Sequence, residues 1–301
     1  MNIGFIGLGN MGSGMAANLL KYCQSHGHQL IVLDLNKHVV DHFVSMGAIE
    51  ADCVASVAKN VDLVFTSLPS SKEINAIALG PGGLLETLPD QAVWFETSTN
   101  ELSEWQLLYE RARSSLTLID APVTGGSEGA AAGTLTMLLG AEPSYLEPYQ
   151  PLLASFTAKA VLMGPSGAGY VAKLCQLHLN YLVAQGIGEA LMLGAKAKLD
   201  LSVLHSVLQK SCAQSYVVDR YIPKVLDGSY DPSFTLGLAS KDMRLVTELG
   251  AHLKVPTILA DEVYSTYCAA GEKYGADQPH LKIVKLIEDS VGQLLRENIV
   301  S

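Results

Sequence analysis

The chain has 301 residues, of which 49% are hydrophobic and 17% charged, and its formal net charge is −10. This length allows two domains, and the composition is that of a globular protein rather than a disordered one. An acidic surface argues against nucleic acid and anionic membranes as main partners, although a local site can still bind an anion.

The five cysteines are scattered along the chain and form no CxxC pair. We interpret them as reduced thiols of a cytoplasmic protein, and we predict no metal site. The first residues lack a basic segment, and glycines interrupt their apolar run, so we expect no signal peptide. No apolar run reaches the ~18 residues that a membrane span needs.

The first half of the chain alternates short apolar runs with helical patterns, at 11–23 and 104–112 among others. The apolar runs lie at 3–6, 30–33, 61–68, 92–95, 116–119, 136–139 and 160–163. Short buried strands that alternate with helices are typical of a parallel-rich sheet covered by helices on both faces. The sequence therefore predicts an α/β Rossmann domain over residues 1–164.

The pattern changes after Gly164-Pro165, where strand signals end. Helical patterns follow at 171–199, 201–209, 216–226, 241–253, 256–271 and 281–295. We therefore predict an all-helical second domain over residues 165–301 that serves substrate binding and dimerisation, in a homodimer or homotetramer.

A glycine-rich turn follows the first predicted strand and opens the first predicted helix. It has the GxGxxG pattern and consists of Gly7, Leu8, Gly9, Asn10, Met11 and Gly12. The first glycine permits a tight turn, the second lets a pyrophosphate approach the backbone, and the third allows close packing of the helix on the sheet. The helix start offers free N–H groups and a positive dipole end to phosphates. This context predicts a dinucleotide-binding turn.

Asp34 closes the second predicted strand, at the spacing expected for the residue that contacts the adenosine ribose. A carboxylate there accepts hydrogen bonds from the ribose hydroxyls and repels a 2′-phosphate. We therefore predict NAD, with NADP as the alternative. Lys37 would soften this preference if it reached the ribose, but we favour its interpretation as a solvated charge at a helix start.

Several further segments carry a family resemblance. They are the runs 15–19 and 120–126, the pairs Leu68-Pro69, Ser98-Thr99 and Lys241-Asp242, the triplet 234–236, and Gly167-Ala168-Gly169 followed by Lys173. Together with the glycine turn they resemble the β-hydroxyacid dehydrogenase family, which includes 3-hydroxyisobutyrate dehydrogenase and tartronate semialdehyde reductase. The resemblance covers essentially the whole chain and implies hydride transfer between a nicotinamide cofactor and a small 3-hydroxy acid.

The resemblance also implies roles for individual residues. Lys173 would be the general acid and base, which requires that burial or a nearby cation such as Lys241 lower its pKa. The substrate carboxylate would bind the backbone N–H groups and hydroxyl of the loop formed by Thr124, Gly125 and Gly126. The cofactor would contact Leu68, Pro69, Thr99 and Lys241.

The chain departs from the family pattern at Leu177. Members usually carry an asparagine there, four residues after the lysine, which hydrogen-bonds the substrate. Gln176 is the first candidate to replace the missing amide, and Asn180, seven residues after Lys173 on nearly the same helix face, is the second. The alternative is that Gln176 faces solvent and Leu177 only packs.

Three other functions compete with this hypothesis. An NADPH-dependent reductase of glyoxylate or succinic semialdehyde usually has a basic residue in place of Asp34. Imine reductases share the layout but lack the lysine found here at 173. A catalytically weak nucleotide-binding module is the non-enzyme alternative. The specific hydroxy acid and the direction of the reaction stay open.

Overall fold

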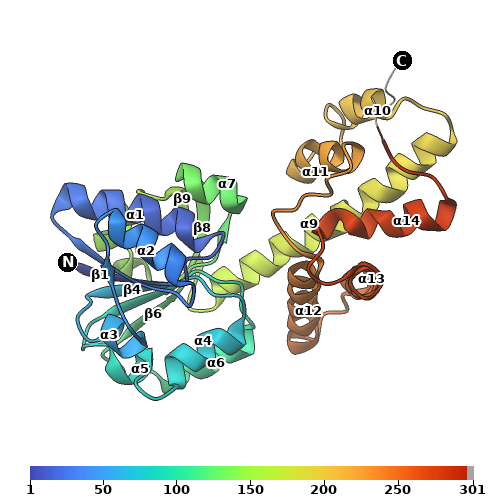
Figure 1. Ribbon diagram of the computed structural model, residues 1–301. Helices are drawn as coiled ribbons and strands as arrows, with labels where there is room; N and C mark the ends of the chain where they lie inside the picture. The colour runs from blue at the N-terminus through green and yellow to red at the C-terminus, as the bar shows by residue number, and fades with distance from the viewer. Residues whose placement is uncertain (297–301) are drawn as a thin grey trace. The chain divides into compact units, whose positions relative to one another are not determined.

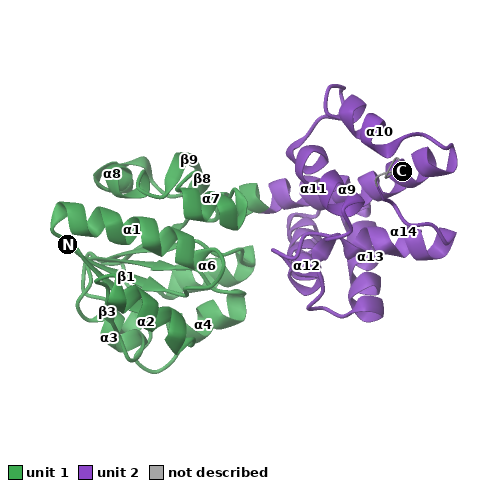
Figure 2. Cartoon of the chain, turned by 45° about the horizontal axis from the view of Figure 1, so that its top comes forward, with its two compact units in different colours: residues 1–173 green, residues 174–301 purple. Residues whose placement is uncertain are grey.

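The computed structural model describes residues 1–296 and divides into two compact units (Figures 1 and 2). Unit 1 comprises Met1–Lys173, and unit 2 begins at Leu174. The division falls inside α9 (Ala168–Lys196), so the start of this helix, through Lys173, belongs to unit 1. The change in sequence pattern near residue 164 coincides with the end of β9 (Thr157–Gly164).

Unit 1 is built on a mixed sheet. Its other strands are β1 (Asn2–Ile6), β2 (Gln29–Leu33), β3 (Ile49–Glu50), β4 (Leu63–Thr66), β5 (Val93–Glu96), β6 (Thr117–Asp120), β7 (Val123–Thr124) and β8 (Leu135–Gly140). The order is β3-β2-β1-β4-β5-β6-β8-β7, with β9 beside β8. The strands from β3 to β6 are parallel, whereas β8 runs antiparallel to β6 and β7. This confirms the predicted parallel-rich Rossmann sheet.

Helices cover both faces of this sheet (Figure 1). One face packs against α1 (Gly12–His26), α2 (Lys37–Ser45), α7 (Gly126–Ala132) and α8 (Gln150–Leu153), and the other against α3 (Val54–Ala58), α4 (Ser71–Leu79), α5 (Leu84–Thr87) and α6 (Leu102–Arg111). The strands are apolar on both sides because each face has its own hydrophobic core. The helices that sequence patterns missed are short, since four to nine residues carry little helical periodicity.

Unit 2 consists of helices around a separate core. They are the rest of α9, α10 (Leu201–Leu208), α11 (Tyr216–Leu226), α12 (Leu236–Leu253), α13 (Ile258–Tyr274), the 3₁₀ turn η3 (His280–Lys282) and α14 (Ile283–Val291). The predicted helix at 241–253 begins earlier, at Leu236, because the Thr235 hydroxyl caps it by accepting a hydrogen bond from the Leu238 N–H at 3.3 Å. Among the described residues, no helix has the length and apolar character needed to cross a membrane.

Candidate active site

The glycine turn between β1 and α1 has the geometry that a dinucleotide requires. Gly7 has a φ of +96°, and a Cβ there would collide with the Ser67 carbonyl oxygen. A Cβ at Gly12 would collide with the carbonyl oxygen of Gly7, whereas a Cβ at Gly9 would meet nothing within 4 Å. Gly7 and Gly12 are therefore required by the fold, and Gly9 leaves open space at the turn, as the approach of a pyrophosphate demands.

Asp34 connects this turn to the end of β2. Its two carboxylate oxygens accept hydrogen bonds from the backbone N–H groups of Leu8 at 2.6 Å and Asn36 at 2.7 Å. Each oxygen keeps a second lone pair that can accept a ribose hydroxyl. The donors and acceptors of the turn therefore fit a nicotinamide dinucleotide, and Asp34 also braces the turn itself.

Lys37 is the first residue of α2 and lies at the surface. Its ammonium contacts the Glu50 carboxylate at 2.5 Å and the Asp41 carboxylate at 3.0 Å. These carboxylates raise the pKa of Lys37. The geometry agrees with a charge at a helix start that is paired with acidic neighbours.

The ends of β4 and β5 are joined by Glu96, a fully buried carboxyl group. Four donors reach its oxygens: the Tyr170 hydroxyl, the Asn100 amide at 2.7 Å, the Ser98 N–H at 3.0 Å and the Thr66 hydroxyl at 3.2 Å. Burial raises the pKa of Glu96 although these donors oppose the shift. The network connects two strand ends to the first turn of α9.

The predicted cofactor residues Leu68, Pro69 and Thr99 lie in the segments that come shortly after β4 and β5. The backbone N–H of Leu68 donates to the Ser98 hydroxyl at 2.8 Å, which joins the segment after β4 to the segment after β5. Leu68 and Thr99 are half-buried, and Pro69 is exposed. The structure thus places these residues at the carboxyl edge of the parallel strands, where ligands of this sheet type bind.

Asp120, the last residue of β6, holds the segment that leads to Lys173. Its fully buried carboxylate accepts the backbone N–H of Gly167 at 2.7 Å and that of Tyr170 at 3.1 Å. A Cβ at Gly169 would lie 2.5 Å from the Leu138 carbonyl oxygen and 2.8 Å from this carboxylate, and one at Gly140 would collide with the carboxylate. The glycines of the GxGxxxK pattern therefore have a physical reason: Gly167 needs its φ of +93°, and Gly169 leaves room for Asp120.

The chain continues from β6 into the predicted substrate loop. Gly125 and Gly126 have φ values of +132° and +69°, which favour glycine, and both are exposed. Thr124 is half-buried at the end of β7. The loop leads directly into α7, so its backbone conformation is fixed at both ends by regular structure.

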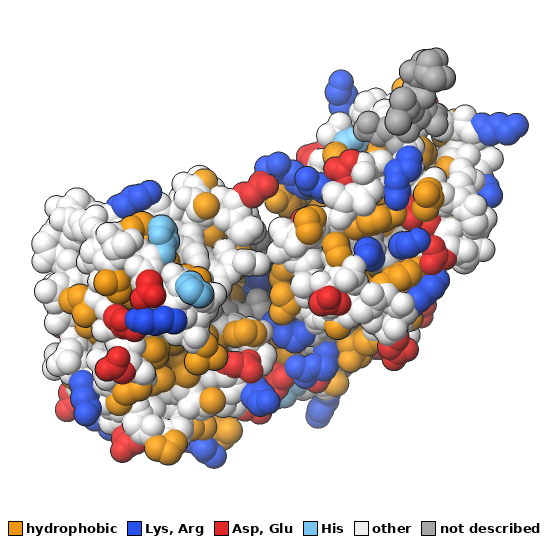
Figure 3. Space-filling model, viewed as in Figure 1, with side chains coloured by type: hydrophobic (Ala, Val, Ile, Leu, Met, Phe, Trp, Pro, Cys, Tyr) orange, Lys and Arg blue, Asp and Glu red, His pale blue; other side chains and the backbone are white. Residues whose placement is uncertain are grey.

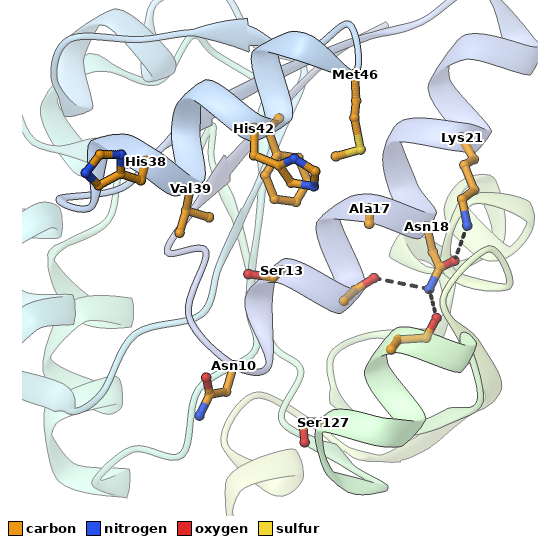
Figure 4. Close-up of a pocket in the computed structure, with 13 residues that line it drawn as sticks. Asn10, Ser13, Ala17, Asn18, Lys21, His38, Val39, His42, Met46 and Ser127 are labelled. Atoms are coloured by element: carbon orange, nitrogen blue, oxygen red, sulfur yellow. Dashed lines mark hydrogen bonds between the residues drawn. The ribbon is translucent and has the colours of Figure 1, made fainter. Parts of the chain in front are cut away.

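A groove of about 610 Å³ lies on unit 1 between α1, α2 and α7. Figure 4 shows Asn10, from the nucleotide turn, and Ser127, from the start of α7, at one end of it. The groove therefore reaches both loops of the candidate site from the side of these helices.

Comparison with known proteins identifies the family of this chain. Residues 2–164 match the NAD-binding domain of 6-phosphogluconate dehydrogenase, and residues 167–287 match the NAD-binding region of NADP-dependent 3-hydroxyisobutyrate dehydrogenase. The chain is 32% identical to an NAD-dependent L-serine dehydrogenase of Pseudomonas aeruginosa over 97% of its own length and 99% of the relative. It is 33% identical to a 2-(hydroxymethyl)glutarate dehydrogenase of Eubacterium barkeri, which it matches over 90% of each chain.

The chain belongs to the β-hydroxyacid dehydrogenase family. It is an oxidoreductase of small hydroxy acids that uses a nicotinamide dinucleotide. Its fold also resembles a 3-hydroxyisobutyrate dehydrogenase of Mycobacterium tuberculosis solved with L-serine, with a TM-score of 0.86, 24% identity, and coverage of 95% of this chain and 98% of that one.

Unit 2 carries the other predicted site residues of this dehydrogenase. Gln176 is half-buried on α9, and the Asn180 side-chain oxygen accepts a hydrogen bond from the Tyr221 hydroxyl at 3.4 Å. Leu177 is buried in the core of unit 2, with 6% of its surface exposed. The Lys241 ammonium lies 3.0 Å from the carboxylate of Asp242.

Sequence patterns did not assign roles to Glu96, Asp120 or Tyr170. Asp120 lies in a family motif, which was a signal, but the motif alone does not reveal that its side chain binds backbone 47 and 50 residues away. Glu96 directly follows an apolar run, and an acid at the end of a buried strand was the only available sign. These residues fix the end of β5, the end of β6 and the start of α9.

The buried carboxyl group of Asp120 predicts a specific pH dependence of stability. Burial raises the pKa of Asp120 from 3.8 to about 6, although the backbone N–H groups oppose the shift. The folded protein binds this proton more tightly than the unfolded chain does. Protonation of Asp120 therefore stabilises the fold fully below pH ~4, and this stabilisation is lost as the pH rises through 6. A two-unit shift corresponds to about 3 kcal/mol.

Asp120→Asn cannot ionise, so its free energy of unfolding should improve relative to the wild type as the pH rises from 4 to 7. Urea unfolding of both proteins at four pH values measures this difference. A difference that stays constant over the range would contradict the prediction.

Proposed function

We propose that this dehydrogenase interconverts a 3-hydroxy acid and its aldehyde, with Lys173 as general acid and base. The observation that carries the proposal is the anchoring of the helix start before Lys173 by Asp120. The same strand, β6, leads within a few residues to Thr124 and the two loop glycines. One rigid element of unit 1 thus supports both the lysine and the loop proposed for the substrate carboxylate.

The substrates named for the relatives share one fragment. L-Serine, 2-(hydroxymethyl)glutarate and 3-hydroxyisobutyrate all carry a CH₂OH group on the carbon next to a carboxylate, and they differ in the third substituent. We propose the same fragment for the substrate of this chain. Turnover of a panel of such acids, and of glyoxylate and succinic semialdehyde, with both cofactors tests this function, and inactivity on every member would refute it.

In the proposed reaction, the N–H groups of Gly125 and Gly126 and the Thr124 hydroxyl bind the carboxylate and orient the alcohol. Lys173 in its neutral form accepts the hydroxyl proton and becomes an ammonium. NAD bound at the glycine turn would supply the acceptor for the hydride that leaves the carbinol carbon, and this carbon would become the aldehyde carbon. In the reverse direction the ammonium of Lys173 returns the proton to the carbonyl oxygen.

Replacement of Lys173 tests this role. Lys173→Ala should lower turnover by roughly two to four orders of magnitude, the usual contribution of a general acid or base. Cofactor affinity should change little, because the glycine turn between β1 and α1 is intact. Lys196→Ala, at the other end of α9, is the matched control and should be silent. Near-normal turnover of the Lys173 variant would remove this lysine from the mechanism.

The cofactor is proposed to be NAD rather than NADP, on the basis of Asp34. Its carboxylate, held by the Leu8 and Asn36 N–H groups, would accept ribose hydroxyls and repel a 2′-phosphate. The paired state of Lys37 supports this assignment.

Fluorescence titration with NADH and NADPH should therefore give the lower Kd for NADH. Equal or tighter binding of NADPH would reverse the assignment and favour the NADPH-dependent semialdehyde reductase.

The amide that the family usually carries at position 177 is proposed to be supplied by Gln176, with Asn180 as the second candidate. Leu177 packs in the core of unit 2, and Gln176 is the neighbouring residue whose longer side chain ends in an amide.

Gln176→Ala should lower kcat/KM by roughly ten- to a hundred-fold, as expected for the loss of a hydrogen bond to a charged group. Cys175→Ala, at the exposed neighbouring position, is the control. Leu177→Asn should mainly destabilise the fold, by about 2–4 kcal/mol, because it buries an amide in an apolar core. An unchanged kcat/KM in both Gln176→Ala and Asn180→Ala would refute the proposal that one of these residues supplies the missing amide.

We also propose a cytoplasmic homodimer or homotetramer that associates through unit 2. Figure 3 shows hydrophobic side chains at the surface of this unit, and large exposed ones include Leu179, Leu193, Val203, Val207, Ile258 and Leu259. Sedimentation velocity should give the mass of two or four chains, and Ile258→Glu, at a residue that is 76% exposed, should weaken the association if α13 takes part. A monomer at micromolar concentration would contradict both assemblies. The five free cysteines support the cytoplasmic location.

A further inference from the structure

Asn18 lies on α1, six residues after the glycine turn ends, and its side chain reaches a different helix. The amide nitrogen of Asn18 donates to the carbonyl oxygens of Ala130 at 3.0 Å and Ala131 at 3.1 Å, both near the end of α7, and to the Gly14 carbonyl at 3.1 Å. Figure 4 shows this side chain between the two helices. The contact joins residues 112 and 113 positions apart in the sequence.

Gly14, one turn before Asn18, makes the approach of these helices possible. A Cβ at Gly14 would lie 2.6 Å from the backbone carbon of Ala130 and 2.6 Å from the backbone nitrogen of Ala131. Backbone atoms cannot move aside as the end of a flexible side chain can. Helices α1 and α7 therefore touch along their backbones at this point, and Asn18 fastens the contact.

Helix α7 depends on such a contact. It has seven residues, and helices of that length are not stable without tertiary support. The last carbonyl groups of a helix lack hydrogen-bond donors within the helix. In α7 the Asn18 amide donates to two of these carbonyl groups, those of Ala130 and Ala131. The first residue of α7 is Gly126, and its N-cap is Gly125, the two glycines of the proposed carboxylate loop.

Helix α1 thus has two attachments. Its first residue is Gly12 of the glycine turn, and its Gly14–Asn18 face holds α7. The turn that fits the pyrophosphate and the loop proposed for the carboxylate are connected through this contact between two helices.

We propose that Asn18 is a positioning residue, which locks the Thr124–Gly126 loop to the glycine turn and so fixes the substrate carbon relative to the nicotinamide. The inference rests on the function proposed above. Hydride transfer is sensitive to this separation, because reacting atoms must meet at a near-attack geometry. Asn18 contacts neither ligand and acts through the loop.

Two variants disturb the contact in different ways. Asn18→Ala removes the donors, and Gly14→Ala pushes α7 away from α1. Both should lower kcat/KM for the hydroxy acid by roughly ten-fold or more and raise KM, while the Kd of NADH changes by less than about two-fold. The primary deuterium isotope effect on kcat/KM should rise, because hydride transfer becomes slower than the steps around it.

Lys21→Ala is the matched control. Lys21 lies one turn further along α1, and its ammonium is 3.5 Å from the Asn18 side-chain oxygen, but it does not reach α7 in the described contacts. This variant should keep the kinetics of the wild type. A purely structural role of Asn18 would lower the active fraction and leave KM and the isotope effect unchanged, and that result would overturn the proposal.

Amide hydrogen exchange separates a failure of this proposal from a failure of the proposed function. In Asn18→Ala, exchange at residues 125–132 should become faster, while residues 7–12 stay protected when NADH is bound. Unchanged exchange at 125–132 would overturn the proposal whether or not the wild type turns over a hydroxy acid. Wild-type inactivity on the whole panel would refute the proposed function by itself.

Discussion

The structure of unit 1 depends on a buried carboxylate that is held by backbone N–H groups. Asp120 is removed from water, and the backbone N–H groups at the start of α9 compensate for part of that cost. The first N–H groups of a helix have no partners within it, and its dipole favours a negative charge there. These hydrogen bonds give partners both to the buried carboxylate and to the N–H groups, and they place the beginning of α9 against the end of β6.

The neighbouring positions follow from this one pairing. Gly140 lies opposite Asp120 in the antiparallel register of β6 and β8, and any side chain there would displace the carboxylate. Gly167 and Gly169 are glycines for related reasons of conformation and space. Glu96 holds the same helix turn through the Tyr170 hydroxyl. Two buried acids therefore fix the turn before Lys173, and a fixed position is what the proposed role of this lysine in proton transfer requires.

Local patterns in the sequence predicted much of the fold. The glycine turn, the buried strands and the helix at 216–226 agree with the structure because each depends on neighbouring residues. The two-residue strands β3 and β7 were missed, since they exist only through pairing with distant strands. The predicted strand at 92–95 stops before Glu96, yet β5 includes this acid because donors 30 and 74 residues away satisfy it. Contacts over such separations leave no periodic trace in the sequence, so the residues that hold the site were less predictable than the loops themselves.

The distribution of backbone and side-chain contacts explains how one scaffold can serve relatives with different substrates. On the proposed function, the carboxylate and the alcohol, which these substrates share, are bound by loop N–H groups and by one lysine. Backbone N–H groups do not change with the side chains around them, so this part of recognition is preserved when other positions vary. The third substituent differs from an ammonium in serine to a carboxyethyl group in hydroxymethylglutarate, and only side chains can distinguish such groups. Leu177 packs in the core of unit 2, and a polar side chain at this position would lose that packing. On the proposed function, the chain therefore keeps the chemistry of the family, and Gln176 makes the contact that an asparagine at position 177 usually makes.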